Sequence, residues 1–141
     1  MLTVEKHPAI DSTTNDLADL GYVEISGPEW LAWAGTRTLF DGALTSVAAI
    51  IDLAVLHDQP QESEALCRRF EEWSRPLRGG GMATLIVLVD VPTPEVLAQV
   101  LQGDRAWYCA HVTRVVYDTN ARIYWFWQPA TGIQRSQRLP A

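Results

Sequence analysis

The order of apolar and polar positions predicts helices in the first half of the chain and strands in the second. Three short elements come first: a helix over residues 12–20 that Gly21 ends, a strand over 22–25 and a helical turn over 28–35. Serine and threonine residues at the start of the first helix are N-cap candidates. A proline opens the helical turn, at the position where helices favour it.

The apolar run over residues 43–56 is the most extended in the chain. Only Thr45, Ser46 and Asp52 interrupt it, so the segment is apolar on nearly every side. It is shorter than the about 20 residues that a helix needs to cross a bilayer. This pattern is typical of a helix at the centre of a hydrophobic core. We therefore predict a central core helix here.

A second, amphipathic helix is predicted over residues 62–75. Leu66, Phe70 and Trp73 recur at helical spacing, while charged residues occupy another face. Because only a short turn separates the two predicted helices, we expect them to form an antiparallel helical hairpin. Residues 77–82, with three consecutive glycines, then read as a flexible connection.

The second half of the chain alternates between strand and helix signals. Residues 83–89 form an apolar run rich in branched side chains, which predicts a strand buried on both faces. A helix is expected over residues 95–101, with Thr93 as its N-cap and Pro94 at its first position. Two β-rich segments and a loosely held polar tail end the chain, at residues 106–117, 121–128 and 129–141.

Together these elements predict an α+β fold. An N-terminal helical region, with its helical hairpin, packs in two layers against a C-terminal β-α-β-β sheet. We expect one domain over residues 1–141: a helical part at about 12–76, a Gly-rich connection at 77–82, a β-α-β-β part at 83–128 and the tail at 129–141. The composition, 48% hydrophobic and 20% charged, supplies a core and excludes intrinsic disorder.

The predicted β-hairpin at residues 106–128 carries most of the aromatic side chains of the second half. A three-residue loop at 118–120 would set Thr113 opposite Trp125 and His111 opposite Trp127. One face would then carry Trp107, Cys109, His111, Thr113, Val115, Ile123, Trp125 and Trp127. The other would carry Tyr108, Val112, Arg114, Val116, Arg122, Tyr124 and Phe126.

Both faces of this predicted hairpin are largely apolar. In a two-layer domain the helices cover one sheet face, so the second face must meet another sheet, a partner subunit or a ligand. The alternative is that the N-terminal part of the same chain covers it. Which of these holds decides whether the hairpin is core, interface or pocket.

Cys109 and His111 alternate onto one side of the predicted strand. Strand geometry separates them by about 6.5–7 Å, too far for the roughly 2.6–3.2 Å hydrogen bond of a nucleophile and its base. They also make only half of a four-ligand zinc site, and His7 and His57 stand at no recognisable ligand spacing. We therefore predict no catalytic pair, metal site or cofactor.

Two aspartates are weaker candidates. Asp90 follows a buried strand and precedes a helix, where open α/β sheets place ligand-binding groups. The favoured interpretation is that it accepts hydrogen bonds from the turn and the first helical residues. Asp52, if buried, needs a partner such as Arg37, Arg68 or Arg69, so an ion pair is favoured over a general base.

The charges divide unevenly between the two halves of the chain. Residues 1–66 hold eleven acidic and two basic side chains, formally −9, whereas residues 67–141 hold six acidic and nine basic, formally +3. This asymmetry predicts either an acidic interaction surface or two halves that neutralise each other. Because the basic residues are scattered, nucleic acid is not an expected partner.

A cytoplasmic location is expected, because no signal or transit segment is evident at the N-terminus. No apolar run is long enough to span a membrane, so no membrane partner is expected. Cys67 and Cys109 are far apart in a chain that can fold without disulfides, so both are predicted to be thiols in the core.

Two functions remain. The first is a small acidic intracellular protein, non-catalytic and regulatory, that uses the aromatic hairpin for self-association as a homodimer or for docking another protein. The alternative is a small-molecule-binding protein or enzyme with a pocket lined by Trp107, His111, Trp125 and Trp127. We favour the first, because polar groups able to do chemistry are sparse among the aromatics. The predicted binding residues are Asp90, Trp107, His111, Arg114, Tyr124, Trp125 and Trp127.

Overall fold

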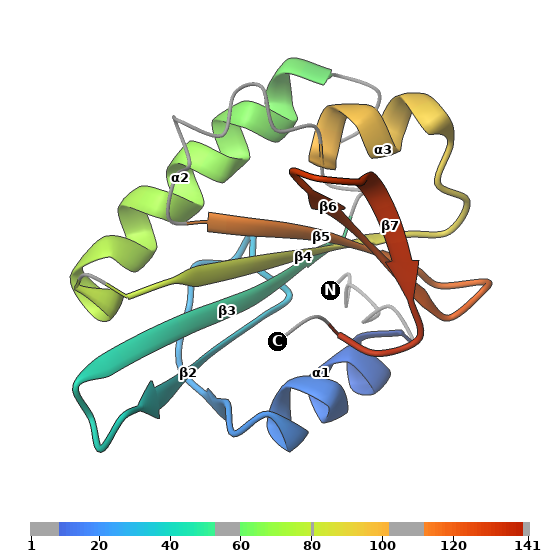
Figure 1. Ribbon diagram of the computed structural model, residues 1–141. Coiled ribbons are helices and arrows are strands. Elements are labelled where there is room, and N and C mark those ends of the chain that lie inside the picture. The colour runs from blue at the N-terminus through green and yellow to red at the C-terminus, as the bar shows by residue number, and fades with distance from the viewer. Residues whose placement is uncertain (1–8, 53–59, 80, 102–111, 140–141) are drawn as a thin grey trace, which may run out of the picture.

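The protein has an α+β fold with one mixed, open sheet and helices interleaved along the chain (Figure 1). A computed structural model describes residues 9–52, 60–79, 81–101 and 112–139. The described elements, in chain order, are α1 (Ala9–Asp19), β1 (Val23–Glu24), β2 (Trp33–Leu39), β3 (Leu44–Asp52), α2 (Pro60–Arg78), β4 (Ala83–Val89), α3 (Pro94–Leu101), β5 (Val112–Asp118), β6 (Ile123–Gln128) and β7 (Gly132–Ser136).

The seven strands lie in the sheet in the order in which they follow along the chain. The three central strands, β3, β4 and β5, are parallel to one another. Ala83 lies opposite Val47 on one side and opposite Val112 on the other, which fixes the register of the centre. The outer strands join antiparallel, β1 and β2 on one side and β6 and β7 on the other.

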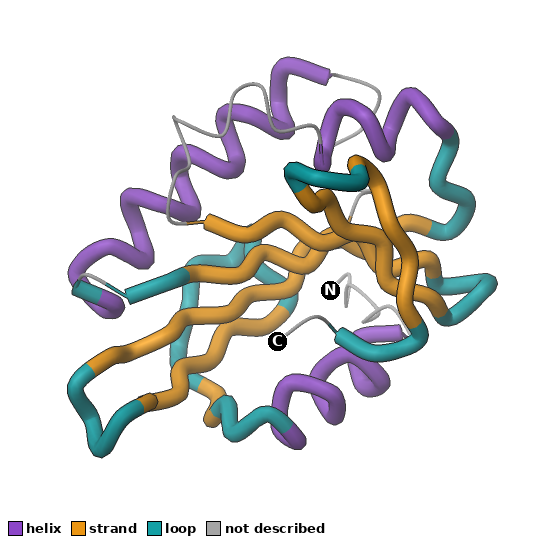
Figure 2. The backbone as a smooth tube through the Cα atoms, viewed as in Figure 1, coloured by secondary structure: helices purple, strands orange, loops and turns teal. Residues whose placement is uncertain are grey.

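Helices cover both faces of the sheet, in three layers (Figure 2). The crossovers β3–α2–β4 and β4–α3–β5 progress in the same direction across the sheet, so right-handed connections place α2 and α3 on the same face. Helix α1 packs on the opposite face (Figure 1). The predicted two-layer arrangement, with an N-terminal helical hairpin, is therefore wrong.

The largest correction concerns the predicted central core helix, because residues 44–52 form strand β3. Val47, Ala49 and Ile51 belong to the core beneath α2 and α3, whereas Ala48 and Ile50 belong to the core above α1. A central strand buried on both faces is as uniformly apolar as a buried helix. Hydrophobic periodicity therefore could not separate the two structures.

The segment around Trp33 is also a strand and not a helical turn. The turn is confined to the start of the predicted segment, where the Leu31 N–H donates to the Pro28 carbonyl at 3.0 Å. Gly35 lies inside β2 and does not end a helix. An added Cβ at Gly35 would lie 2.2 Å from the Trp33 ring, so the glycine makes room for an indole that folds along its own strand.

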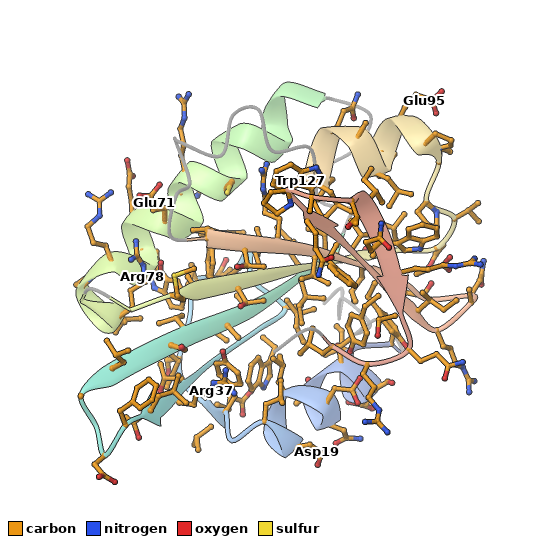
Figure 3. The ribbon with its side chains drawn as sticks, in the orientation of Figure 1. Asp19, Arg37, Glu71, Arg78, Glu95 and Trp127 are labelled. Atoms are coloured by element: carbon orange, nitrogen blue, oxygen red, sulfur yellow. The ribbon has the colours of Figure 1, made fainter. Side chains whose placement is uncertain are left out.

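In the glycine-rich connection between α2 and β4, the Gly81 N–H donates to the Arg78 carbonyl at 2.8 Å and closes a turn. Arg78, at the end of α2, is only 4% exposed, and its position beside the start of β4 is visible in Figure 3. Its guanidinium donates to the Gly81 carbonyl at 3.0 Å and to the Ser74 hydroxyl at 3.3 Å. The turn therefore holds α2 against the sheet.

Several predicted elements are confirmed. Helix α1 ends before Gly21, whose φ is 97°, and β4 is buried on both faces as expected. Helix α3 begins after Thr93, whose hydroxyl accepts from the Val96 N–H at 3.2 Å. The prediction of a loosely held tail is wrong for residues 132–136, because they pair with β6 as strand β7.

The two faces of the sheet give two cores. The α2/α3-side core includes Val47, Ala49, Ile51, Cys67, Phe70, Leu85, Val87, Leu97, Val112 and Val116. The α1-side core includes Ile10, Leu17, Tyr22, Trp33, Ala48, Ile50, Ile86, Leu88, Val115, Tyr117 and Tyr124. As predicted, Cys67 is a buried thiol in a core, while Cys109 lies outside the described residues.

Substitution of Gly81 tests how tightly the turn before β4 is packed. An alanine Cβ there would lie 1.9 Å from the Thr45 carbonyl oxygen. At Gly79 an added Cβ would have no atom within 4 Å, and the only obstacle to alanine is the left-handed φ of 56°. We expect Gly81→Ala to lower the free energy of unfolding by about 1–3 kcal/mol more than Gly79→Ala. Urea denaturation measures both, and equal losses would contradict the close approach of β3 to this turn.

Candidate functional site

The turn between β5 and β6 positions the aromatic hairpin. Four residues, 119–122, connect Asp118 to Ile123, which lie directly opposite each other. The Asp118 carboxylate accepts from the backbone N–H groups of Asn120 at 3.1 Å and Ala121 at 3.0 Å. Arg122, with φ of 57°, takes the left-handed conformation in this loop.

This loop is one residue longer than predicted and shifts the register. Trp125 lies opposite Val116 and not opposite Thr113. Because the shift is odd, it exchanges the faces of β6 relative to those of β5. Trp125 therefore shares the α2/α3 side with Val116, while Tyr124 shares the α1 side with Val115. The signal that could have revealed this is Asp118, which favours turns closed by its own carboxylate.

Tyr124 lies in the α1-side core and is 1% exposed. Its hydroxyl donates to the Asp16 carboxylate of α1 at 2.5 Å, and its ring lies 4.7 Å from that of Tyr117. Burial raises the pKa of Tyr124 far above its ordinary value, and the hydrogen bond and negative charge of Asp16 raise it further. Of the predicted binding residues, this one ties α1 to the sheet.

Trp125 and Trp127 lie on the α2/α3 side of the hairpin. Trp125 is half-buried against the core, and the Arg135 guanidinium lies 6.0 Å from its ring centroid. Within the described residues, its buried indole Nε1–H has no hydrogen-bond acceptor. Trp127 is 37% exposed and lies opposite Ile133; Figure 3 shows it on the β6–β7 hairpin.

The remaining predicted residues of the hairpin are only partly described. Arg114 is half-buried on β5, and strand alternation places it on the α2/α3 side with Val112 and Val116. Trp107 and His111 lie outside the described residues. The structure thus brings Arg114, Trp125 and Trp127 to one side of the sheet and Tyr124 to the other.

Asp90 and Asp52 both lie at the carboxyl ends of central strands. Asp90 is exposed, and its carboxylate accepts from the Thr119 hydroxyl at 2.6 Å, while the Thr119 N–H donates to the Val89 carbonyl at 3.0 Å. Asp90 thereby fastens the β5–β6 turn to the end of β4. Asp52 is half-buried at the end of β3, opposite Leu88.

A hollow of about 420 Å³ opens at the β1–β2 edge of the sheet, between the end of β1 and the start of β2. Residues 24–27 and 31–34 line it, so much of its wall belongs to one loop. That loop is fixed against α2, where the Arg69 guanidinium lies 5.0 Å from the Trp30 ring centroid. Trp125 and Trp127, the two described residues of the predicted aromatic pocket, do not line this hollow.

The described residues contain no group of three or more histidine, cysteine or acidic side chains that could hold a metal ion. Among the described helices, none is long and apolar enough to cross a membrane. No protein-family model, curated protein sequence or solved structure matches the chain.

Removal of the Tyr124 hydroxyl tests the tie between α1 and β6. Tyr124→Phe leaves the Asp16 carboxylate without its partner, so we expect the free energy of unfolding to fall by about 1–3 kcal/mol. Tyr117→Phe is the matched control. It also removes a tyrosine hydroxyl, from the ring next to Tyr124, but this hydroxyl has no described hydrogen bond. Urea denaturation compares the variants, and similar losses for both would argue against the tie.

The pH dependence of stability gives a second test of the same bond. Above about pH 10 the tyrosine of the unfolded chain loses its proton, whereas folded Tyr124 keeps it because its pKa is raised. The unfolded state then binds fewer protons than the folded state. The contribution of Tyr124 to the free energy of unfolding is therefore constant below about pH 10 and falls as the pH rises above it. We expect Tyr124→Phe to lose stability less steeply over this range in denaturation curves, and parallel pH profiles would contradict the assignment.

Proposed function

We propose that the chain is a non-catalytic interaction protein that docks an acidic segment of a partner protein on its β6–β7 hairpin. The observation that carries the proposal is Trp127, a large aromatic side chain that remains 37% exposed beside a hydrophobic core. Tryptophan and arginine are enriched among the residues that contribute most of the binding energy at protein interfaces. We place this function in the cytoplasm, where a thiol such as Cys67 stays reduced.

The charge of the hairpin supports an acidic partner. Residues 119–139 contain three arginines, Arg122, Arg135 and Arg138, and no aspartate or glutamate. All three are exposed. A carboxylate from a partner could pair with Arg135 while an apolar side chain packs on Trp127, so charge and shape would select the same ligand.

The open edge of the sheet supports an extended partner. Among the described strands β7 is the last in the sheet, so one side of its backbone faces away from β6. Edge strands offer unpaired N–H and C=O groups to which another extended segment can add. Docking would then combine backbone pairing along Gly132–Ser136 with side-chain contacts at Trp127 and Arg135.

Selection from a library of displayed random peptides tests this proposal. We expect the selected peptides to be acidic and to contain an apolar anchor, and Trp127→Ala to weaken their binding at least about tenfold in calorimetric titration. Arg135→Glu should weaken it as well, and its effect should shrink at high salt. Val91→Ala is the matched control, because Val91 is 69% exposed in the loop after β4 and away from the hairpin.

Two results would overturn the proposal. One is a set of peptides that bind the Trp127→Ala variant as tightly as the wild type. The other is tight, Trp127-dependent binding of a single-stranded oligonucleotide used as a parallel probe, since bases also stack on exposed aromatic residues. The net charge of −6 leads us to expect no such binding.

A further inference from the structure

Within the described part of the chain, α1 covers only part of its side of the sheet (Figure 1). Helix α1 has 11 residues and a length of about 16 Å, whereas seven strands spaced at about 4.8 Å make a sheet on the order of 30 Å wide. Ile10 and Leu17 of α1 pack with Ile50, Ile86 and Leu88, which lie in the carboxyl-terminal halves of β3 and β4. The amino-terminal ends of the same strands extend beyond α1 (Figure 1).

Beyond α1, the described strands carry a row of uncharged side chains, which we call the open strip. Leu39 and Leu44 lie opposite each other at the end of the β2–β3 hairpin, and Thr84 lies opposite Thr113 on β4 and β5. Met82 directly precedes β4. Alternation from the assigned core residues places all five on the α1 side. The open strip consists of Leu39, Leu44, Met82, Thr84 and Thr113, with Phe40 at its tip.

The strip is exposed although it contains large apolar side chains. Leu44 is 41% exposed and Met82 is 48% exposed. The two are close, because the Val47 N–H donates to the Met82 carbonyl at 3.1 Å and therefore holds the start of β4 beside β3. Diagonal neighbours on adjacent strands are about 7–8 Å apart, within reach of long side chains.

Phe40 adds a strained and exposed aromatic ring at the end of this strip. Its φ is 54° and its exposure is 76%. A bulky residue rarely adopts the left-handed conformation, which Phe40 takes in the β2–β3 turn, where its carbonyl accepts from the Ala43 N–H at 3.1 Å. Such strain is typical of residues whose position serves binding.

Two charges without an ionic partner flank the strip. Arg37 lies on the same side of β2, two residues before Leu39, and its guanidinium donates to the Leu20 carbonyl at 3.0 Å and stacks on Tyr22. Asp41 is exposed in the hairpin turn, one residue after Phe40. Within the described part of the chain, neither has an oppositely charged group in ion-pair distance.

We propose that two copies of this chain form a symmetric dimer through their open strips. A two-fold axis near the Leu39–Leu44 pair brings Asp41 of each copy to Arg37 of the other and stacks the apolar side chains between them. The same surface thus carries both members of each ion pair, as an interface related by two-fold symmetry requires. A chain of net charge −6 repels its copy over most of its surface, so an uncharged strip is where two copies can approach.

The size of the strip sets the strength of the dimer. The strip spans four strands and offers on the order of 500 Å² per copy, below the about 800 Å² per partner of a standard stable interface. The dimer is therefore weak and reversible, with a dissociation constant on the order of micromolar or higher. This proposal uses the face and the end of the sheet that the β6–β7 hairpin does not occupy.

Sedimentation velocity over a range of concentrations tests the dimer. Wild-type protein should shift from monomer to dimer as its concentration rises. Met82→Asp should raise the dissociation constant at least about tenfold, because it places two like charges in the apolar centre. Val91→Asp is the matched control: it makes the same change at an exposed position beyond the opposite end of β4 and should leave association unchanged.

Phe40→Gly and Asp41→Arg separate the two contributions to the interface. Phe40→Gly removes both the aromatic contact and the left-handed strain, so we expect weaker association together with a higher melting temperature of the monomer. Asp41→Arg should also weaken association, whereas Asp19→Arg, the same charge change on the exposed surface of α1, should leave it unchanged.

Three outcomes would overturn the proposal: a monomer at every concentration, a dimer that Met82→Asp, Phe40→Gly and Asp41→Arg leave unaffected, or a dimer that only Trp127→Ala dissociates. The last would place self-association on the hairpin. Peptide binding at the hairpin is measured on variants of Trp127 and Arg135, whereas dimer formation is measured on variants of the open strip. A result that rules out the dimer therefore leaves the proposed function untouched, and a result that rules out peptide binding leaves the dimer untouched.

Discussion

The structure depends on the need to bury both faces of three parallel strands. β3, β4 and β5 are apolar on each side and lie in the centre of the sheet. Their two crossover connections are right-handed and progress the same way, so both α2 and α3 lie on one face. The other face must be covered by chain from outside this βαβαβ unit, and α1 is the helix that does so.

This constraint explains how α1 is attached. A single helix of 11 residues buries little apolar area, so two polar ties at the carboxyl-terminal end of α1 add to its packing. The Asp16 carboxylate accepts from Tyr124 of β6, and Arg37 of β2 donates to the Leu20 carbonyl just after the helix. Arginine at this end also interacts favourably with the helix dipole. These two bonds connect α1 to strands on both sides of the parallel centre.

The sequence predicted elements with local signals and failed where the decision was tertiary. Thr93 and Pro94 mark the start of α3, and Gly21 the end of α1, because caps act within one turn of a helix. Residues 44–52 are apolar throughout, and only their pairing with β2 and β4 makes them a strand. The sequence identified the aromatic residues of the hairpin but not the side of the sheet on which each lies. One extra residue in the loop after Asp118 exchanged the two sides of β6 relative to β5. The open strip gave no sequence signal. Leu44 and Met82 look like ordinary core residues in the sequence, and their exposure follows from the position of α1 in the fold.

The same topology places the β2–β3 and β6–β7 hairpins at opposite edges of the sheet. The β2–β3 hairpin, with Phe40 at its turn, and the β6–β7 hairpin, with Trp127, project in different directions from the sheet (Figure 1). A dimer formed at the open strip leaves both β6–β7 hairpins accessible, so it presents two docking sites from one assembly. Two linked weak sites bind a partner with repeated acidic segments more tightly than either alone, provided that the partner spans them. Weak self-association would then convert a modest affinity at Trp127 into a response that depends on the concentration of the protein itself.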